Sequence, residues 1–350
     1  MRRRCFLDTA NTPSTGGPRE GDTPFRAGGA SFLLEAGRLH YHNVAPFLSA
    51  VLSLANRKFT VTPQLRLEVL SWIGDFGGGG DFRQVHVLPE PRLALRWEPN
   101  RAVALKGSLG VYHQAPLPAE LFGRFGAPDL VPQAGWAYVA GVDVQPLPRL
   151  TFELDGFYKD LRTLVSRGER PGDPPLVNNG IGRVYGAQLL ARITEWYGLY
   201  GWISYTISRS ERKDHADSPW RVFQFDQTHI FTAVASWKFL RGYQVGARFR
   251  YVTGNPYTPV ERAYLNANGG NYVPVYGGVY SGRLPDFHQL DVRFDKTWTF
   301  KTWSISAYLD VQNIYYRKNT EQLRSNYNFT KFEPVVGIPL FPALGLRGDF

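Results

Sequence analysis

Apolar and polar residues alternate along most of this chain, and this period of two restricts its fold more than any other feature. In residues 59–69, 288–295 and 301–312, nearly every second residue is apolar and most residues between them are polar. Successive side chains of a β-strand point to opposite faces, whereas a helix would spread both sets around its axis. The sequence therefore predicts a protein built from amphipathic β-strands.

The connections between these strands are expected to be short at one end and long at the other. About fourteen strands can be placed, over residues 30–40, 44–55, 58–72, 88–98, 101–113, 135–146, 149–166, 181–194, 198–210, 226–239, 242–255, 285–298, 301–314 and 336–350. Short links are expected near residues 56–58, 99–100, 146–148, 195–196, 240–242 and 299. Long polar or glycine-rich segments fall at residues 73–87, 113–134, 167–180, 210–225, 256–284 and 315–335.

This asymmetry separates two all-β architectures. Strands of soluble sandwiches are usually about five to six residues long. Outer-membrane barrels have longer strands, short periplasmic turns and long outer loops, and their closure leaves no unpaired backbone in lipid. We therefore expect an all-β fold, an antiparallel transmembrane β-barrel of about 14 strands in the cell outer membrane. Residues 1–29 are expected to form a flexible polar N-terminal segment, and residues 30–350 the barrel.

Charge and composition exclude several other classes. The net charge is +10, but the 40 Lys and Arg are interleaved with 30 acidic residues and form no basic helix, so a nucleic-acid partner is not expected. The single cysteine excludes a disulfide framework and a cysteine-based zinc site. Basic residues scattered beside aromatic ones favour anionic lipid headgroups, so outer-membrane lipid and lipopolysaccharide are the expected partners.

Several segments together resemble the C-terminal part of the barrel of a TonB-dependent receptor, a family of outer-membrane ligand-gated transporters. The segments are GVYHQAP (110–116), GRVYGAQLLAR (182–192), YGWISYTISRSER (200–212), FDQTHIFTAVASWKF (225–239), YVTGNPYTPV (251–260), GRLPDFHQLDVRFDKTW (282–298) and LDVQNIYYRKN (309–319). The resemblance implies a barrel of 22 strands, of which this chain would supply the later ones. No plug domain and no TonB box are seen, so we expect a truncated form or a fragment. The TonB complex is expected as a partner only if an upstream plug and TonB box exist.

The chain ends in GLRGDF, with Leu344 and Leu346 in phase with Phe350. A terminal aromatic residue that closes an amphipathic strand resembles the assembly signal of outer-membrane proteins. The barrel-assembly machinery is therefore an expected partner.

The function implied by the resemblance is uptake of a scarce bulky ligand, such as a siderophore complex, by a receptor-type transporter. A self-contained passive porin of 14 strands is the alternative, and a soluble β-sandwich is a third possibility. The chain is not expected to be an enzyme. His229 and Asp226, with Ser208 or Ser210, could be arranged as a catalytic set, but their segment matches an ordinary strand of the family.

Three groups of residues follow from this interpretation, and no cofactor is expected. Polar residues expected to line the lumen or contact a plug are Arg66, Glu68, Asp143, Glu153, Asp155, Gln188, Arg192, Asp291, Arg293, Asp295 and Asp310. Residues of a ligand-contacting outer loop are expected to be Tyr257, Tyr264, Asn266, Asn268, Tyr272 and Tyr276. His40 and His42 could bind a metal from one strand face, but two unrelated histidines are the favoured interpretation and no metal site is expected.

Overall fold

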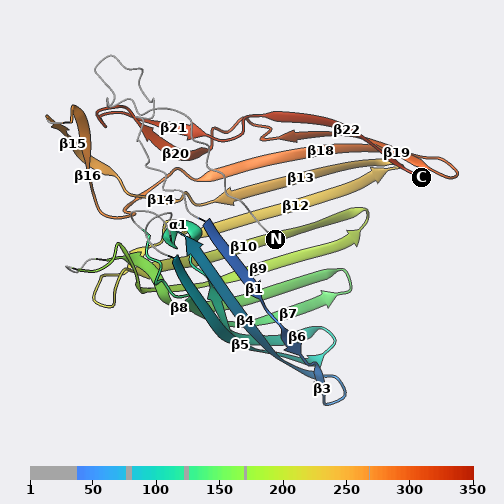
Figure 1. Ribbon diagram of the computed structural model, residues 1–350. Helices are drawn as coiled ribbons and strands as arrows, with labels where there is room; N and C mark the ends of the chain where they lie inside the picture. Colours follow the sequence, from blue (N-terminus) through green and yellow to red (C-terminus); the bar gives the residue numbers. More distant parts are fainter. Residues whose placement is uncertain (1–37, 76–80, 122–125, 169–171, 268) are drawn as a thin grey trace.

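More than half of the described chain forms one large antiparallel sheet (Figure 1). The computed structural model describes residues 38–75, 81–121, 126–168, 172–267 and 269–350. The predicted N-terminal segment 1–29 lies outside these residues, as does Asn268. Long strands follow one another in chain order, in the order β1-β4-β5-β6-β7-β8-β9-β10-β12-β13-β18-β19-β22. The predicted all-β antiparallel fold is therefore confirmed.

The long strands alternate between short turns and long connections, as expected. Their bounds are β1 Arg38–Val44, β4 Phe59–Asp75, β5 Asp81–Asn100, β6 Val103–Gln114, β7 Gln133–Leu147, β8 Leu150–Arg167, β9 Leu176–Trp196, β10 Leu199–Lys213, β12 His229–Leu240, β13 Tyr243–Val252, β18 Phe287–Thr299, β19 Ser304–Gln312 and β22 Phe341–Asp349. The turns β5–β6, β7–β8, β9–β10, β12–β13 and β18–β19 each span only a few residues. Positive φ angles at Glu195, Tyr197 and Gly242 allow two of these turns to reverse the chain tightly.

Of the predicted strand 30–40, residues 30–37 lie outside the described residues, and the predicted break between residues 40 and 44 is corrected by the structure. Residues 38–54 run as one interrupted edge strand, because β1, β2 (Phe47–Ser49) and β3 (Leu52–Leu54) all pair with β4 in one unbroken register. Pro46 has no N–H, yet its carbonyl still accepts a hydrogen bond from Leu67 N at 3.0 Å. Proline therefore interrupts the pairing without producing a turn.

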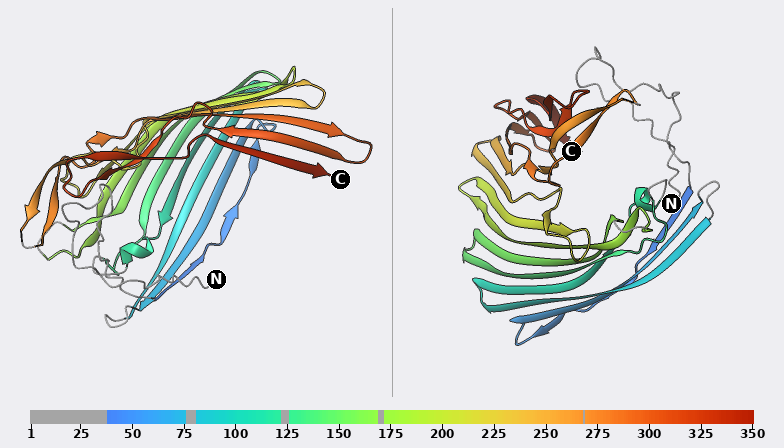
Figure 2. Two further views of the ribbon diagram at one scale, coloured as in Figure 1. Left: turned by 90° about the horizontal axis from the view of Figure 1, so that it is seen from above. Right: turned by 90° about the vertical axis from the view of Figure 1, so that its left-hand side faces the viewer.

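The sheet is strongly curved, and its two faces differ in chemistry. Helix α1 (Pro118–Leu121) lies inside the curve (Figure 2), where Leu121 packs with Leu70 and Trp72 of β4. The face that carries α1 is called the inner face below. The opposite, outer face exposes Leu65 and other large apolar side chains along most strands.

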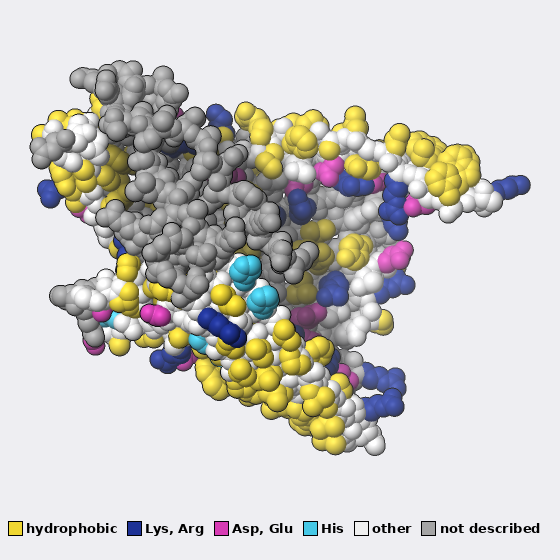
Figure 3. Space-filling view, viewed as in Figure 1, with side chains coloured by type: hydrophobic (Ala, Val, Ile, Leu, Met, Phe, Trp, Pro, Cys, Tyr) yellow, Lys and Arg dark blue, Asp and Glu magenta, His cyan; other side chains and the backbone are white. Residues whose placement is uncertain are grey.

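The sheet does not close on itself, and β1 and β22 each have one neighbouring strand within the described part of the chain. Acidic and basic side chains are visible in the hollow between the two ends of the sheet, whereas hydrophobic side chains cover strands at its lower and upper rims (Figure 3). No helix in the described ranges is long and apolar enough to cross a membrane.

Candidate functional site: the inner face and the long-loop end

Charged residues on the inner face form ion pairs that run from strand to strand. On β6, Lys106 Nζ lies 2.7 Å from Asp143 Oδ1 and 3.0 Å from Asp155 Oδ1, on β7 and β8. Arg96 of β5 reaches the other oxygen of Asp143, with an Nη1–Oδ2 distance of 2.7 Å. Glu153 lies 3.7 Å from the same Lys106 Nζ. Side-chain ion pairs therefore connect four neighbouring strands, β5 to β8, in addition to the backbone hydrogen bonds between them.

A second group surrounds Glu90, which the sequence interpretation missed. The Glu90 side chain is only 3% exposed; its Oε2 lies 2.7 Å from Arg92 Nη2 and 3.7 Å from Arg66 Nε. Its Oε1 accepts a hydrogen bond from the backbone N–H of His113 at 2.7 Å. The period of two along β5 places Glu90, Arg92 and Arg96 on one face, so extending the alternation through residues 88–98 would have found them.

The other predicted inner residues share this arrangement. Arg192 Nη2 lies 3.3 Å from Glu153 Oε1, and Gln188 is paired across strands with Asp155. Near the other end of the sheet, Arg248 donates to Asp291 at 2.6 Å, and Arg293 to Asp295 at 2.8 Å. The remaining predicted members lie in similar contacts, Glu68 with Arg66 and Asp310 opposite Arg293 in the strand register.

The long connections predicted at 256–284 and 315–335 carry short hairpins of their own. Strands β15 (Val260–Asn266) and β16 (Asn271–Tyr276) pair with each other, as do β14 (Pro256–Tyr257) with β17 (Gly282–Arg283) and β20 (Thr320–Ser325) with β21 (Phe332–Val336).

The predicted ligand-contacting residues are distributed over two of these hairpins. Tyr264 and Tyr276 are more than half exposed on the β15–β16 hairpin, whereas Asn266 and Tyr272 lie near its tip. The Tyr272 ring contacts that of Tyr327 edge-on at 5.9 Å. Tyr257 lies on β14, apart from this hairpin. The structure therefore places the described members of the set along one excursion of the chain, on two separate pairs of strands.

A buried ion pair ties the base of this excursion to the sheet. Asp226 is 1% exposed, and its side chain accepts hydrogen bonds from Ser210 N at 2.7 Å and from Arg283 Nη2 at 2.5 Å. Arg283 Nη1 also donates to the carbonyls of Asp226, at 3.0 Å, and Gly254, at 2.9 Å. Asp226 and Arg283 lie in two of the quoted family-like motifs. Their contacts occupy the Asp226 carboxylate and fix the loop base.

Cationic and aromatic side chains gather at the long-loop end of β10. Arg212 lies directly opposite Arg221 of β11 (Arg221–Val222) and stacks over the Phe223 ring at 4.3 Å. Arg221 is neutralised by Asp214 through bonds of 2.6 and 3.0 Å, and these bonds hold the pKa of Asp214 below its ordinary value. Arg212 has no carboxylate within salt-bridge distance among the described residues, and burial lowers its pKa to about 10. This end of the sheet therefore holds excess positive charge.

The predicted assembly signal lies on and just beyond β22, at one edge of the sheet. Leu344 and Leu346 are 83% and 75% exposed, and Phe350 is 99% exposed. The Phe350 ring stacks with Trp303 at a centroid distance of 6.2 Å. These residues thus form an apolar strip at the edge, without a described strand beyond it.

Within the described residues, no group of three or more His, Cys, Asp or Glu side chains is arranged to hold a metal ion.

Solved structures provide a fold-level comparison. The ferric-catecholate import receptor Fiu from E. coli K12 matches with a TM-score of 0.65 and 16% identity, over 89% of this chain and 45% of that one. The FrpB iron transporter from Neisseria meningitidis gives 0.60 and 16%, over 89% and 46%. The ferric preacinetobactin receptor BauA from Acinetobacter baumannii gives 0.63 and 15%, over 89% and 43%. This chain thus spans less than half the length of each of these proteins.

The family of this chain is shown by comparison of its sequence with a family profile. No curated protein sequence matches this chain. The profile of the family described as TonB dependent receptor-like, beta-barrel, matches residues 8–314, which is most of the chain. Proteins of this family are outer-membrane receptors and transporters, and the similar structures are not enzymes. This chain belongs to the TonB-dependent receptor β-barrel family and is an outer-membrane protein.

Proposed function

We propose that this chain forms part of the wall and the outer mouth of a transporter that takes up a scarce, bulky, anionic ligand such as a siderophore complex. Family membership supports receptor-type transport, and Fiu and BauA are named for ferric-catecholate and ferric preacinetobactin ligands. Energy coupling would require the TonB complex as a partner. The passive porin alternative is not favoured, because the matching family is one of receptors.

The observation that carries the ligand class is the cationic mouth at the end of β10. Arg212 and Arg221 lie opposite each other, an arrangement that is unfavourable for like charges unless an anion lies between them. Asp214 neutralises only Arg221. The rings of Phe223 and Tyr280 lie 4.3 Å and 5.4 Å from these guanidinium carbons and add flat apolar surface. Arginine and aromatic side chains together suit an anionic complex with aromatic groups.

Binding to outer-membrane vesicles that contain the full chain tests this proposal. The probes are radioactive iron as a ferric catecholate, the same iron as ferric citrate, and a labelled uncharged oligosaccharide. We expect saturable binding of a ferric complex, weakened at least tenfold in the double variant Arg212→Gln, Arg221→Gln. The matched control is Arg317→Gln with Arg324→Gln, two exposed arginines at the same end of the sheet. It should change binding less than twofold.

Three outcomes would contradict the proposal. Saturable binding of the oligosaccharide alone would show that the mouth does not select anions. Sugar leakage through reconstituted vesicles, at a rate that does not depend on an energised membrane or on TonB, would indicate the passive porin. An equal loss of ferric-complex binding in the test and control variants would show that Arg212 and Arg221 do not form the binding site.

A further inference from the structure

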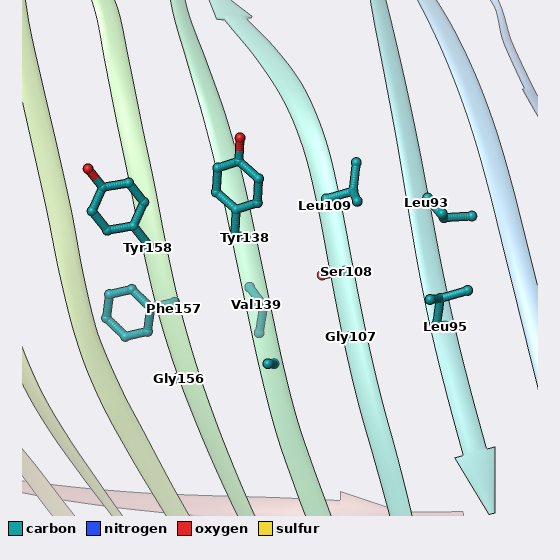
Figure 4. A pocket seen from close by; sticks show the side chains of 11 residues that line it. Leu93, Leu95, Gly107, Ser108, Leu109, Tyr138, Val139, Gly156, Phe157 and Tyr158 are labelled. Atoms are coloured by element: carbon teal, nitrogen blue, oxygen red, sulfur yellow. The ribbon is translucent and has the colours of Figure 1, made fainter.

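A row of tyrosines crosses the outer face partway along the strands, and the strands continue beyond it to the long-loop end. Tyr138 lies opposite Tyr158, and Tyr158 lies opposite Tyr185, on strands β7, β8 and β9. All three are at least 40% exposed. Figure 4 shows Tyr138 and Tyr158 side by side, with both hydroxyls directed toward the end where β6 runs into its long connection. Amphipathic rings in this position mark the interface between hydrocarbon and headgroups.

The surface below this row is apolar. A groove of about 480 Å³ lies there, where Gly107, Ala140 and Gly156 stand opposite one another on β6, β7 and β8 (Figure 4). Leu95 and Leu109 border it. Such a surface suits acyl chains, so the tyrosine row separates an acyl-chain level from a headgroup level.

Three cations lie on the same outer face, at and just beyond the tyrosine row. Arg209 is directly opposite Tyr185, and Arg183 lies two residues beyond Tyr185 on β9. Lys213 follows Arg209 by four residues on β10, and so has the same strand parity. The Arg183 and Lys213 cations both lie over the Trp220 ring, at 4.2 and 5.1 Å.

The carboxylates at this level leave positive charge in excess. Glu211 lies between the two arginines, 2.7 Å from Arg183 Nη2 and 3.2 Å from Arg209 Nε. It neutralises one of the three cations and holds both guanidinium groups in place. Asp160 lies opposite Arg183 but is paired with Arg162 at 2.8 Å. Within the described part of the chain, the terminal amino groups of Arg209 make no hydrogen bond.

We propose that Arg183, Arg209, Lys213 and Trp220 bind a phosphate group of an outer-leaflet lipid, the phosphorylated glycolipid lipopolysaccharide. Guanidinium groups bind phosphate through paired hydrogen bonds, and Trp220 offers apolar surface at the headgroup level. The cations directly continue an apolar, membrane-facing surface, so a lipid headgroup reaches them without leaving the bilayer. The site faces away from the inner face, and it is therefore independent of the proposed transport function.

Native mass spectrometry of the full chain in neutral detergent tests the site, with lipid A carrying two phosphates as the probe. We expect retained lipid A on the unmodified protein and about a hundredfold weaker binding in the triple variant Arg183→Gln, Arg209→Gln, Lys213→Gln, from roughly fivefold for each cation. The control triple variant is Arg101→Gln, Arg149→Gln, Lys301→Gln. These three exposed cations lie in short turns at the opposite end of the strands, and the variant removes the same charge. It should bind lipid A normally.

The single variant Lys213→Gln keeps the test decisive if the triple variant folds poorly. Among the described residues, the hydrogen bond that Lys213 donates is to the carbonyl of Ala216, at 3.2 Å, so its loss should weaken lipid binding about fivefold without affecting folding. Lipid A stripped of its phosphates should bind no better to the unmodified protein than to the triple variant. Equal binding of phosphorylated lipid A to test and control variants would overturn the proposal. If millimolar inorganic phosphate displaced lipid A completely, the site would be one for free phosphate, and the assignment to a lipid would be overturned.

Discussion

Removing Arg283 should release the base of the 256–284 excursion from the sheet. The buried Asp226 carboxylate accepts from Arg283, Ser210 N and Thr228 Oγ1, and Arg283 also binds two backbone carbonyls. Breaking a buried pair by removing one partner costs about 3–5 kcal/mol. The Arg283 side chain is 30% exposed, so solvent screening should reduce this cost to about 2–3 kcal/mol for Arg283→Met.

Hydrogen exchange is the appropriate assay, because the loss is local. A cost of about 2–3 kcal/mol raises the population of the open loop base roughly 30- to 150-fold. The faster exchange should appear in peptides that include Ser210 and Gly254, whose backbone groups bond to this cluster. Peptides from the short turns should exchange as before.

A double-mutant cycle tests whether Asp226 and Arg283 stabilise the loop base as a pair. Asp226→Asn combined with Arg283→Met should cost at least 1 kcal/mol less than the sum of the two single changes, because the asparagine leaves no unpaired buried charge. Arg347→Met is the control, since the Arg347–Asp349 pair is 74% and 51% exposed and should contribute less than about 1 kcal/mol. Unchanged exchange in Arg283→Met, or strictly additive costs, would refute the role of the Asp226–Arg283 pair at the loop base.

Three further perturbations follow from the structure. Arg221 lowers the pKa of Asp214, so this ion pair should stabilise the β11 loop fully above the unfolded pKa of Asp, about 3.9, and lose that contribution as the pH falls through the lower folded pKa. Hydrogen exchange in this loop between pH 5 and 2 measures the lost stability, and Asp214→Asn should remove its pH dependence. A Cβ on Gly141 would meet Asp155 Oδ1 and Leu154 O, so Gly141→Val should destabilise the sheet by about 1–3 kcal/mol in thermal unfolding. A Cβ on Gly107 would make only an ordinary van der Waals contact, 3.8 Å from Val139 O, so Gly107→Ala should be nearly neutral. Leu121→Ala should cost about 2–5 kcal/mol and expose the 115–121 segment to protease; unchanged cleavage would contradict the packing of α1.

Periodicity predicted most of the sheet because barrel strands depend on near neighbours. The face of Asp143, Glu153 and Asp155 follows from counting by two along β7 and β8, without knowledge of distant residues. Pairing partners follow from chain order, since each short turn makes the next strand a neighbour. The continuity of residues 38–54 was missed because the prediction ended one strand at residue 40 and began the next at residue 44, whereas β1 runs through this gap and shares its register with β2. Only the register against β4 shows that the strand direction is unchanged there.

The inward position of α1 was not predicted, yet β4 carries a signal for it. Along the inner face of β4, the residues change from Arg66 and Glu68 to Leu70 and Trp72, which are each 1% exposed. Two successive large apolar side chains are not expected on a water-exposed wall, because leaving both in water would forgo several kcal/mol of free energy from their burial. Some segment must therefore cover them, and the connection after GVYHQAP does so through Leu121. A break in the polar alternation of an inner face thus predicts where a loop folds inward, even though it does not identify that loop.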